Sequence, residues 1–196
     1  MTQPRVDVFI DYQNLHLSAG EAFAPAGTPA HTYLIHPARF VDALMQRRLM
    51  YGRGGTVQNI HVYRGQPSSA KEPIPASRNK AQAAEWSRDR RVRMNTRTLR
   101  YPRNWPADKA KEKGVDVKLA VDFVRCALTT DADTLILASR DTDLVPALEM
   151  AIDLGKVQIE VAGWSLTSRL RVPGKQLWCT SLSGAEYVSC KDPKQY

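Results

Sequence analysis

An apolar run near the N-terminus ends at a carboxylate, and this feature most constrains the fold. Val6, Val8 and Ile10 alternate along one face of the segment while Phe9 lies on the other, the pattern of a strand buried on both sides. Asp11 follows directly. In open α/β sheets ligands bind beyond the carboxyl ends of parallel strands, so we expect Asp11 to point into a site rather than into the core.

A second apolar segment, residues 134–138, runs into Asp141 and Asp143, and Asp116 begins a helical segment between the two strands. These acids can converge with Asp11 at one edge of the sheet. Hard divalent cations prefer oxygen ligands, so the sequence predicts a Mg²⁺ or Mn²⁺ site held by Asp11, Asp116 and Asp141, with Asp143 bound directly or through a water. The amide of Asn14 would hold a water or a phosphate oxygen.

Each acid has a structural alternative. Asp116 lies in the first turn of its helix, where the helix dipole favours a negative charge without any ligand. Thr142 or Asp143 could cap the helix that ends near Gly155, which would account for acids at this position. Asp122 lies about 120° around the helix from Asp116 and so should pair with Lys118 or Arg125 instead.

Three motifs in this order resemble the bacterial kind of NYN domain, a branch of the PIN-like nucleases. They are F-I-D-Y-Q-N-L at 9–15, K-G-V-D-V-K-L-A-V-D at 113–122 and A-S-R-D-T-D-L-V-P at 138–146. The resemblance covers residues 5–163. Arg140 and Leu144 stand where the family more often has glycine and phenylalanine, and Asp7 stands where a small apolar residue is usual. These departures affect the expected substrate preference and local packing, and none of them removes a carboxylate.

The spacing of apolar residues and the resemblance predict an α/β fold, a three-layer α/β/α sandwich around a mostly parallel sheet, PIN-like. Residues 1–196 would form one domain, with 184–196 as a loosely ordered C-terminal extension and 15–37 as a loop at the rim of the site. The helix from Asp116 to Leu128 should be largely buried. Its apolar stripe consists of Val117, Val121, Val124 and Leu128, and it is widened by Leu119, Ala120, Phe123 and Ala127. Further helices are expected at 38–51, 76–88 and before Gly155, and strands at 57–63, 92–99, 135–138, 157–162 and 176–181.

The net charge is +8, and residues 88–113 hold ten Lys or Arg against three acids. Basic residues interleaved with aromatics suit single-stranded RNA, whose phosphates pair with cations while its bases stack. The alternative is a solvated face around a mobile loop. We expect RNA binding by Arg88, Arg90, Arg91, Arg93, Arg97, Arg100, Tyr101, Arg103, Trp105, Lys109, Lys111 and Lys113.

No apolar run approaches the length needed to span a membrane, and no signal peptide is recognisable at the N-terminus. The three cysteines lack metal-site spacing and favour a reducing cytoplasm. His16 could serve as a general acid or phosphate contact, but a surface or helix-start position is the favoured interpretation.

These patterns predict a metal-dependent ribonuclease that hydrolyses RNA phosphodiester bonds. The main rival is a catalytically silent nucleic-acid-binding or regulatory module of the same fold. A small-molecule phosphatase using the same acids is less favoured, because a small substrate needs no long basic surface. The sequence makes no prediction of oligomeric state.

Overall fold

The computed structural model describes residues 3–194 and 196, and a six-stranded sheet in the order β3-β2-β1-β4-β5-β6 forms its centre. All five strand pairings are parallel. The strands are β1 (Arg5–Asp11), β2 (Thr56–Gln66), β3 (Val92–Thr98), β4 (Thr134–Ala138), β5 (Gln158–Trp164) and β6 (Trp178–Leu182). The predicted α/β class with a mostly parallel sheet is confirmed.

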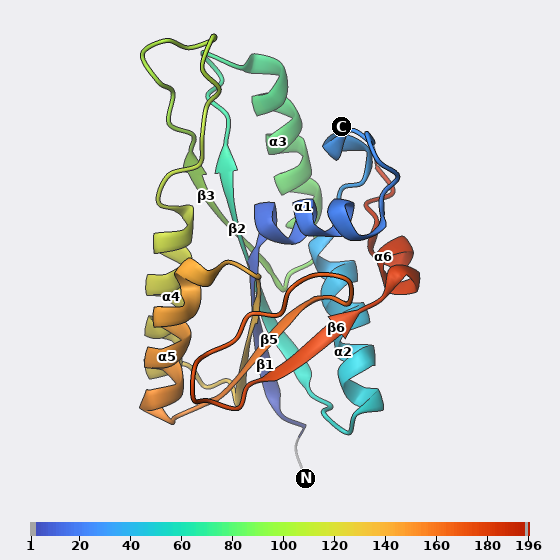
Figure 1. The fold of residues 1–196 in the computed structure, drawn as a ribbon, viewed down its shortest axis with the longest axis vertical. Coiled ribbons are helices and arrows are strands. Elements are labelled where there is room, and N and C mark those ends of the chain that lie inside the picture. The colour runs from blue at the N-terminus through green and yellow to red at the C-terminus, as the bar shows by residue number, and fades with distance from the viewer. Residues whose placement is uncertain (1–2, 195) are drawn as a thin grey trace.

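Helices cover both faces of the sheet, so the molecule has three layers (Figure 1). One face carries α1 (Tyr12–Phe23), α2 (Pro37–Met50), α3 (Pro73–Trp86) and α6 (Gly184–Cys190), and the other carries α4 (Val115–Thr129) and α5 (Val145–Leu154). Two short 3-10 helices, η1 (Ala30–Thr32) and η2 (Thr142–Leu144), lie in connections. No described helix is long and apolar enough to cross a membrane.

β1 explains why the sheet separates two cores. Val6, Val8 and Ile10 pack with the α1, α2 and α6 layer, while Phe9 packs edge-on against Phe123 of α4 at 5.1 Å between ring centroids. The alternation of apolar residues along β1 therefore arises, as predicted, because both faces of the strand are buried. Asp7 is also buried, and its Oδ1 accepts hydrogen bonds from the backbone and side-chain nitrogens of Asn59.

The predicted loop over residues 15–37 was wrong in its first part, because α1 continues to Phe23. Leu15 and Ala19 are one turn apart and buried, which gives this helix a packing face. Gly20 resembled a loop residue in the sequence, yet it lies inside the helix. A Cβ at Gly20 would collide with the ring of Tyr33, so the glycine permits close packing rather than a turn.

The predicted buried stripe of α4 was also wrong. Val117 and Val121 are each 61% exposed and Leu128 is 44% exposed. Leu119, Phe123 and Ala127, which were predicted only to widen this stripe, form the face that packs against the sheet. Asp122 pairs with Lys118 at 2.7 Å and with Arg125 at 3.2 Å, as predicted.

Part of the segment predicted as a loosely ordered extension, residues 184–190, forms helix α6. Ser183 and Glu186 form a capping box at the start of α6, and Cys190 is fully buried. Beyond α6, Asp192 accepts a hydrogen bond of 2.6 Å from the indole nitrogen of Trp86, and its backbone nitrogen donates to Leu34. These bonds hold the segment against α3.

A buried ion pair joins α2 to β5. Arg48 and Glu160 are 2% and 0% exposed, and the guanidinium binds both carboxylate oxygens of Glu160 at 2.9 Å each. Arg53 adds a third bond to the same carboxylate at 3.0 Å. The paired geometry satisfies both buried charges.

The strand order places β1 and β4 side by side at the centre of the sheet. From β1 the chain turns toward β2, while from β4 it turns toward β5 on the opposite side. This point of divergence is where open α/β sheets leave a crevice between the outgoing connections. The residues that follow β1 and β4 therefore share one edge.

Candidate active site

Asp11 ends β1 and is the N-cap of α1. Its Oδ1 accepts a hydrogen bond of 3.2 Å from the backbone nitrogen of Asn14, and its Oδ2 accepts one of 3.0 Å from the Ser139 hydroxyl. Burial, with smaller contributions from the carboxylates of Glu112 and Asp141, raises the pKa of Asp11 to about 6 despite the lowering effect of these two hydrogen bonds. Asp11 therefore lies in the negative electrostatic field of two neighbouring carboxylates.

Asp141 and Ser139 continue the site from β4. The Ser139 hydroxyl accepts a bond of 3.0 Å from the Asp141 backbone while donating to Asp11, so it links the two acids. Asp141 caps η2 by accepting from the backbone nitrogen of Asp143. A carboxylate has capacity for several further bonds, so this capping role leaves Asp141 able to bind a ligand. Ser139 was not identified as a site residue from the sequence.

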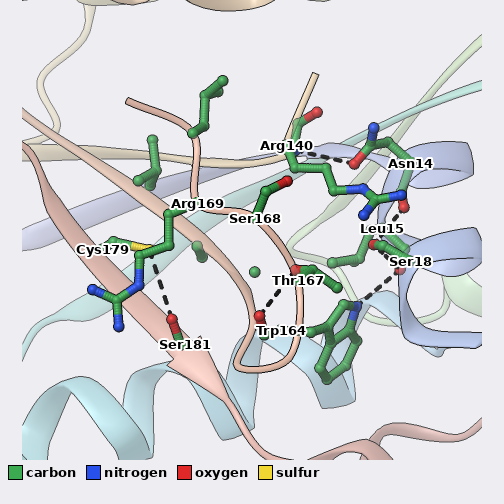
Figure 2. A pocket seen from close by; sticks show the side chains of 15 residues that line it. Asn14, Leu15, Ser18, Arg140, Trp164, Thr167, Ser168, Arg169, Cys179 and Ser181 are labelled. Carbon is green, nitrogen blue, oxygen red and sulfur yellow. Dashed lines mark hydrogen bonds between the residues drawn. The ribbon is translucent and has the colours of Figure 1, made fainter. Parts of the chain in front are cut away.

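Asn14 ties the two strand ends together. Its Oδ1 accepts a hydrogen bond of 3.0 Å from the backbone nitrogen of Arg140 (Figure 2). The Arg140 side chain pairs with Glu21 of α1, and both residues line the same pocket as Asn14. The side-chain oxygen of Asn14 therefore holds the loop after β4, and only its amide NH₂ remains to meet a ligand.

Glu112 is the acid that sequence reasoning missed. Its Oε1 accepts a bond of 2.6 Å from the backbone nitrogen of Gly65 at the carboxyl end of β2. A Cβ at Gly65 would lie 2.7 Å from Glu112 Cγ, so only glycine allows this approach. Burial raises the pKa of Glu112, and Asp116 raises it further. The available signal was its position four residues before Asp116, ahead of the same helix.

The four acids Asp11, Glu112, Asp116 and Asp141 line one pocket of about 340 Å³. Asn14 and Arg140 complete its inner wall, and Gln13, Leu17, Glu21 and Val115 its remaining surface. Asp116 enters from the first turn of α4, on the opposite layer from α1. The pocket thus collects carboxylates from both layers at the divergence of β1 and β4. Asp143 does not line it and is exposed.

The donor set of this pocket suits a hard divalent cation, since it offers several carboxylate oxygens. Within residues 3–194 and 196, however, no three His, Cys, Asp or Glu side chains lie close enough together to enclose a metal ion. Mg²⁺ is commonly held by one or two carboxylates, with waters and substrate phosphates filling its other positions. The pocket fits that open kind of site, and it does not fit a closed metal cage.

The basic stretch 88–113 is divided by β3 into two separate surfaces. Arg88, Arg90, Arg91 and Arg93 lie at the amino end of the strand, away from the acids. Arg88 pairs with Glu85, and Arg91 pairs with Asp42 and Asp89. At the carboxyl end, a hollow of about 730 Å³ is lined by Glu112 together with Arg100, Arg103, Lys109, Lys111 and Lys113. Arg97 also lies at this end, near Gly114.

The loop after β3 is closed at its base. Arg100 and Lys111 exchange two backbone hydrogen bonds of 2.8 and 3.0 Å. Within the loop, the rings of Tyr101 and Trp105 lie 5.7 Å apart, and the Tyr101 hydroxyl donates to Glu72. The closure holds Glu112 next to the acids while the basic residues of the loop face the adjoining hollow.

His16 is buried in α1 rather than at the surface. Burial lowers its pKa to about 4, with Arg64 adding to the effect, so the imidazole is neutral at pH 7. Its Nδ1 has no hydrogen-bond partner among the described residues. A cationic phosphate contact through His16 is therefore disfavoured.

The raised pKa of Asp11 predicts a pH-dependent difference in stability between the wild type and Asp11→Asn in metal-free buffer. The folded state binds this proton more tightly than the unfolded state, whose carboxyl keeps its ordinary value near 3.8. The wild type should therefore lose stability as pH rises from about 4 to about 6, by at most ~3 kcal/mol. In urea unfolding, the free energy of unfolding of the variant should rise relative to that of the wild type between pH 4 and pH 6. Above pH 6 the difference should stay constant. An equal free-energy difference at pH 4 and pH 7 would contradict the prediction.

The model of the NYN domain family matches residues 5–172. Among solved structures, a crystal structure of a protein of unknown function from Vibrio parahaemolyticus has a TM-score of 0.51 and 15% sequence identity, covering 97% of this chain and 90% of that one. At this identity the likeness concerns the fold alone. No curated protein gave a significant match.

Proposed function

Because the chain belongs to the NYN domain family, as its three motifs predicted, we propose that it is a metal-dependent ribonuclease acting on single-stranded RNA. The family has a nuclease fold. The observation that carries the proposal is that carboxylates from β1, the loop before α4, α4 and the loop after β4 line one pocket. A binding surface for RNA alone would gain nothing from such a cluster, since carboxylates repel phosphates.

In this proposal Asp11, Asp116 and Asp141 would bind Mg²⁺ or Mn²⁺, one or two of them directly and the others, with Glu112, through waters bound to the ion. Such an ion would lower the pKa of a water and offset the negative charge on the phosphate oxygens. Ser139 fixes the Asp11 carboxylate relative to Asp141. The free NH₂ of Asn14 orients a water or a phosphate oxygen. The attacking water forms the new bond to phosphorus as the bond to the leaving oxygen breaks.

The RNA surface in this proposal is the carboxyl-end half of the basic stretch. Arg100, Arg103, Lys109, Lys111 and Lys113 line a hollow that shares Glu112 with the acidic pocket, and Arg97 lies beside it. Trp105 offers a ring for base stacking, and Tyr101 beside it would contribute through the face that Lys71 does not cover. We leave Arg88, Arg90, Arg91 and Arg93 out of this surface because they lie at the opposite end of β3. The three cysteines are free thiols, which supports a cytoplasmic location.

A metal-dependent cleavage assay tests the proposal. End-labelled, unstructured RNA should be cut when Mg²⁺ or Mn²⁺ is added and should remain intact in EDTA, as judged on a denaturing gel. A DNA oligonucleotide of the same sequence, tested under the same conditions, shows whether cleavage requires the ribose 2′-hydroxyl. Binding without cleavage under either ion would instead support the catalytically silent module, and a phosphatase would release inorganic phosphate from small esters while leaving the RNA uncut.

A further inference from the structure

Resting on the proposed function, we infer that RNA binds on both sides of the acidic pocket, and that the connection from β5 to β6 provides a second cationic arm through Arg169 and Arg171. This arm lies far from the basic loop in sequence and carries no motif. We place this arm next to the acidic pocket because the hollows between them share lining residues, as described below. The scissile phosphate would then lie between two cationic surfaces rather than at the end of one.

Arg169 and Arg171 are displayed outward by the residues next to them. Leu170 and Val172 are 4% and 3% exposed and pack into the core beside α4 and α5, so the two arginines face solvent. Lys175 pairs with Asp153 of α5 at 2.7 Å and holds the end of the connection. Within the described part of the chain, neither Arg169 nor Arg171 has a carboxylate within 4 Å. Both guanidinium groups are therefore available to phosphates.

The arm is continuous with the active site. Asn14 and Arg140 line the acidic pocket and also a small hollow that Arg169 borders on its far side. In Figure 2, Ser168 lies between Arg140 and Arg169. This hollow has only about 10 Å³ of room, which is the size of a single water. An RNA backbone would therefore pass over it, along the exposed Ser168.

Beyond Arg169 the surface opens again. A hollow of about 520 Å³ is lined by three cations, Arg169, Arg171 and Lys175, and it reaches Trp178 at the start of β6. The Trp178 ring is already covered by Arg53, whose guanidinium lies 4.2 Å from the ring centroid. This arm thus offers charge without a free stacking face. We expect it to hold phosphates and to be strongly sensitive to salt.

The test measures RNA affinity for Arg169→Gln/Arg171→Gln by fluorescence anisotropy, in EDTA so that the RNA stays intact. Each lost phosphate contact should reduce the log-log salt slope by about 0.7, so the double variant should lose ~1.4. That difference amounts to roughly 25-fold in affinity between 1 M and 0.1 M salt. With oligonucleotides of increasing length, the affinity of the variant should also stop rising at a shorter RNA than that of the wild type.

The matched control removes two cations from the other edge of the sheet. Arg125 lies late in α4 and Lys156 directly before β5, and both are exposed. Arg125→Gln/Lys156→Gln should keep the wild-type slope and length dependence. If Arg169→Gln/Arg171→Gln behaves like this control, the second arm is overturned even where the wild type cleaves RNA. If the arm is required for binding but the wild type never cleaves, the nuclease proposal fails and the arm stands.

Discussion

Asp11→Asn and Asp141→Asn should each reduce metal-dependent RNA cleavage by roughly 10²- to 10⁴-fold, since a bound ion is worth several kcal/mol of transition-state stabilisation. Both substitutions remove a negative charge from the pocket while keeping the shape of the side chain. Asn at position 11 can still accept the backbone bond from Asn14, and the hydroxyl of Ser139 can reverse to accept from the new amide. The loss should therefore lie in chemistry and metal binding, with the fold intact.

Thermal unfolding separates these effects. Mn²⁺ should raise the melting temperature of the wild type, because an ion bound only by the folded state stabilises it. Asp11→Asn and Asp141→Asn should abolish that rise. Asp131→Asn is the matched control, since Asp131 is exposed before the amino end of β4, on the opposite edge of the sheet. A full Mn²⁺ response and full cleavage in both pocket variants would refute the assignment of these acids.

Glu160→Gln should be the most destabilising of the substitutions considered. The change leaves Arg48 charged and 2% exposed without its carboxylate partner. Breaking a buried ion pair in this way costs about 3–5 kcal/mol. For a domain of this size, the loss should lower the melting temperature by roughly 6–20 °C. Differential scanning calorimetry measures it directly.

Two further variants show whether the cost comes from the orphaned charge. Arg48→Met/Glu160→Leu removes both charges and keeps apolar volume, so it should recover most of the lost stability. Asp153→Asn breaks the pair with Lys175, whose side chains are 42% and 60% exposed, and should cost less than about 1 kcal/mol. If the double variant were as unstable as Glu160→Gln, loss of packing rather than an unpaired charge would explain the effect.

Much of the fold was predictable because period-2 and period-3.6 patterns report which side chains are buried. The exceptions have local causes. Gly20 suggested a loop but serves a close contact with Tyr33, which only the tertiary structure reveals. Along α4, two apolar stripes compete, and the sequence does not say which one faces the sheet. In the structure Leu119 and Phe123 are buried, and Val117 and Val121 are exposed.

The candidate site was predictable where it follows strand ends and was missed where it depends on contacts distant in sequence. Asp11 and Asp141 stand directly after buried strands. Glu112 reaches the pocket only because Gly65, 47 positions away, allows its approach. The basic stretch looked like one surface because its members are neighbours in sequence. The two halves nevertheless lie at opposite ends of a seven-residue strand, so contiguity in sequence did not mean a shared surface.

The paired backbone bonds between Arg100 and Lys111 make the intervening loop an exchangeable part of the protein. Residues 101–110 are joined to the domain through this base and through the hydrogen bonds of the Tyr101 hydroxyl with Glu72 and Ser68, while Glu112 is fixed separately by Gly65. A loop of different length or charge could therefore be grafted between the same two anchor residues while the carboxylates stay in place. The loop would then determine RNA preference, and the carboxylates at the strand ends would determine bond cleavage. Each property could change in evolution without the other.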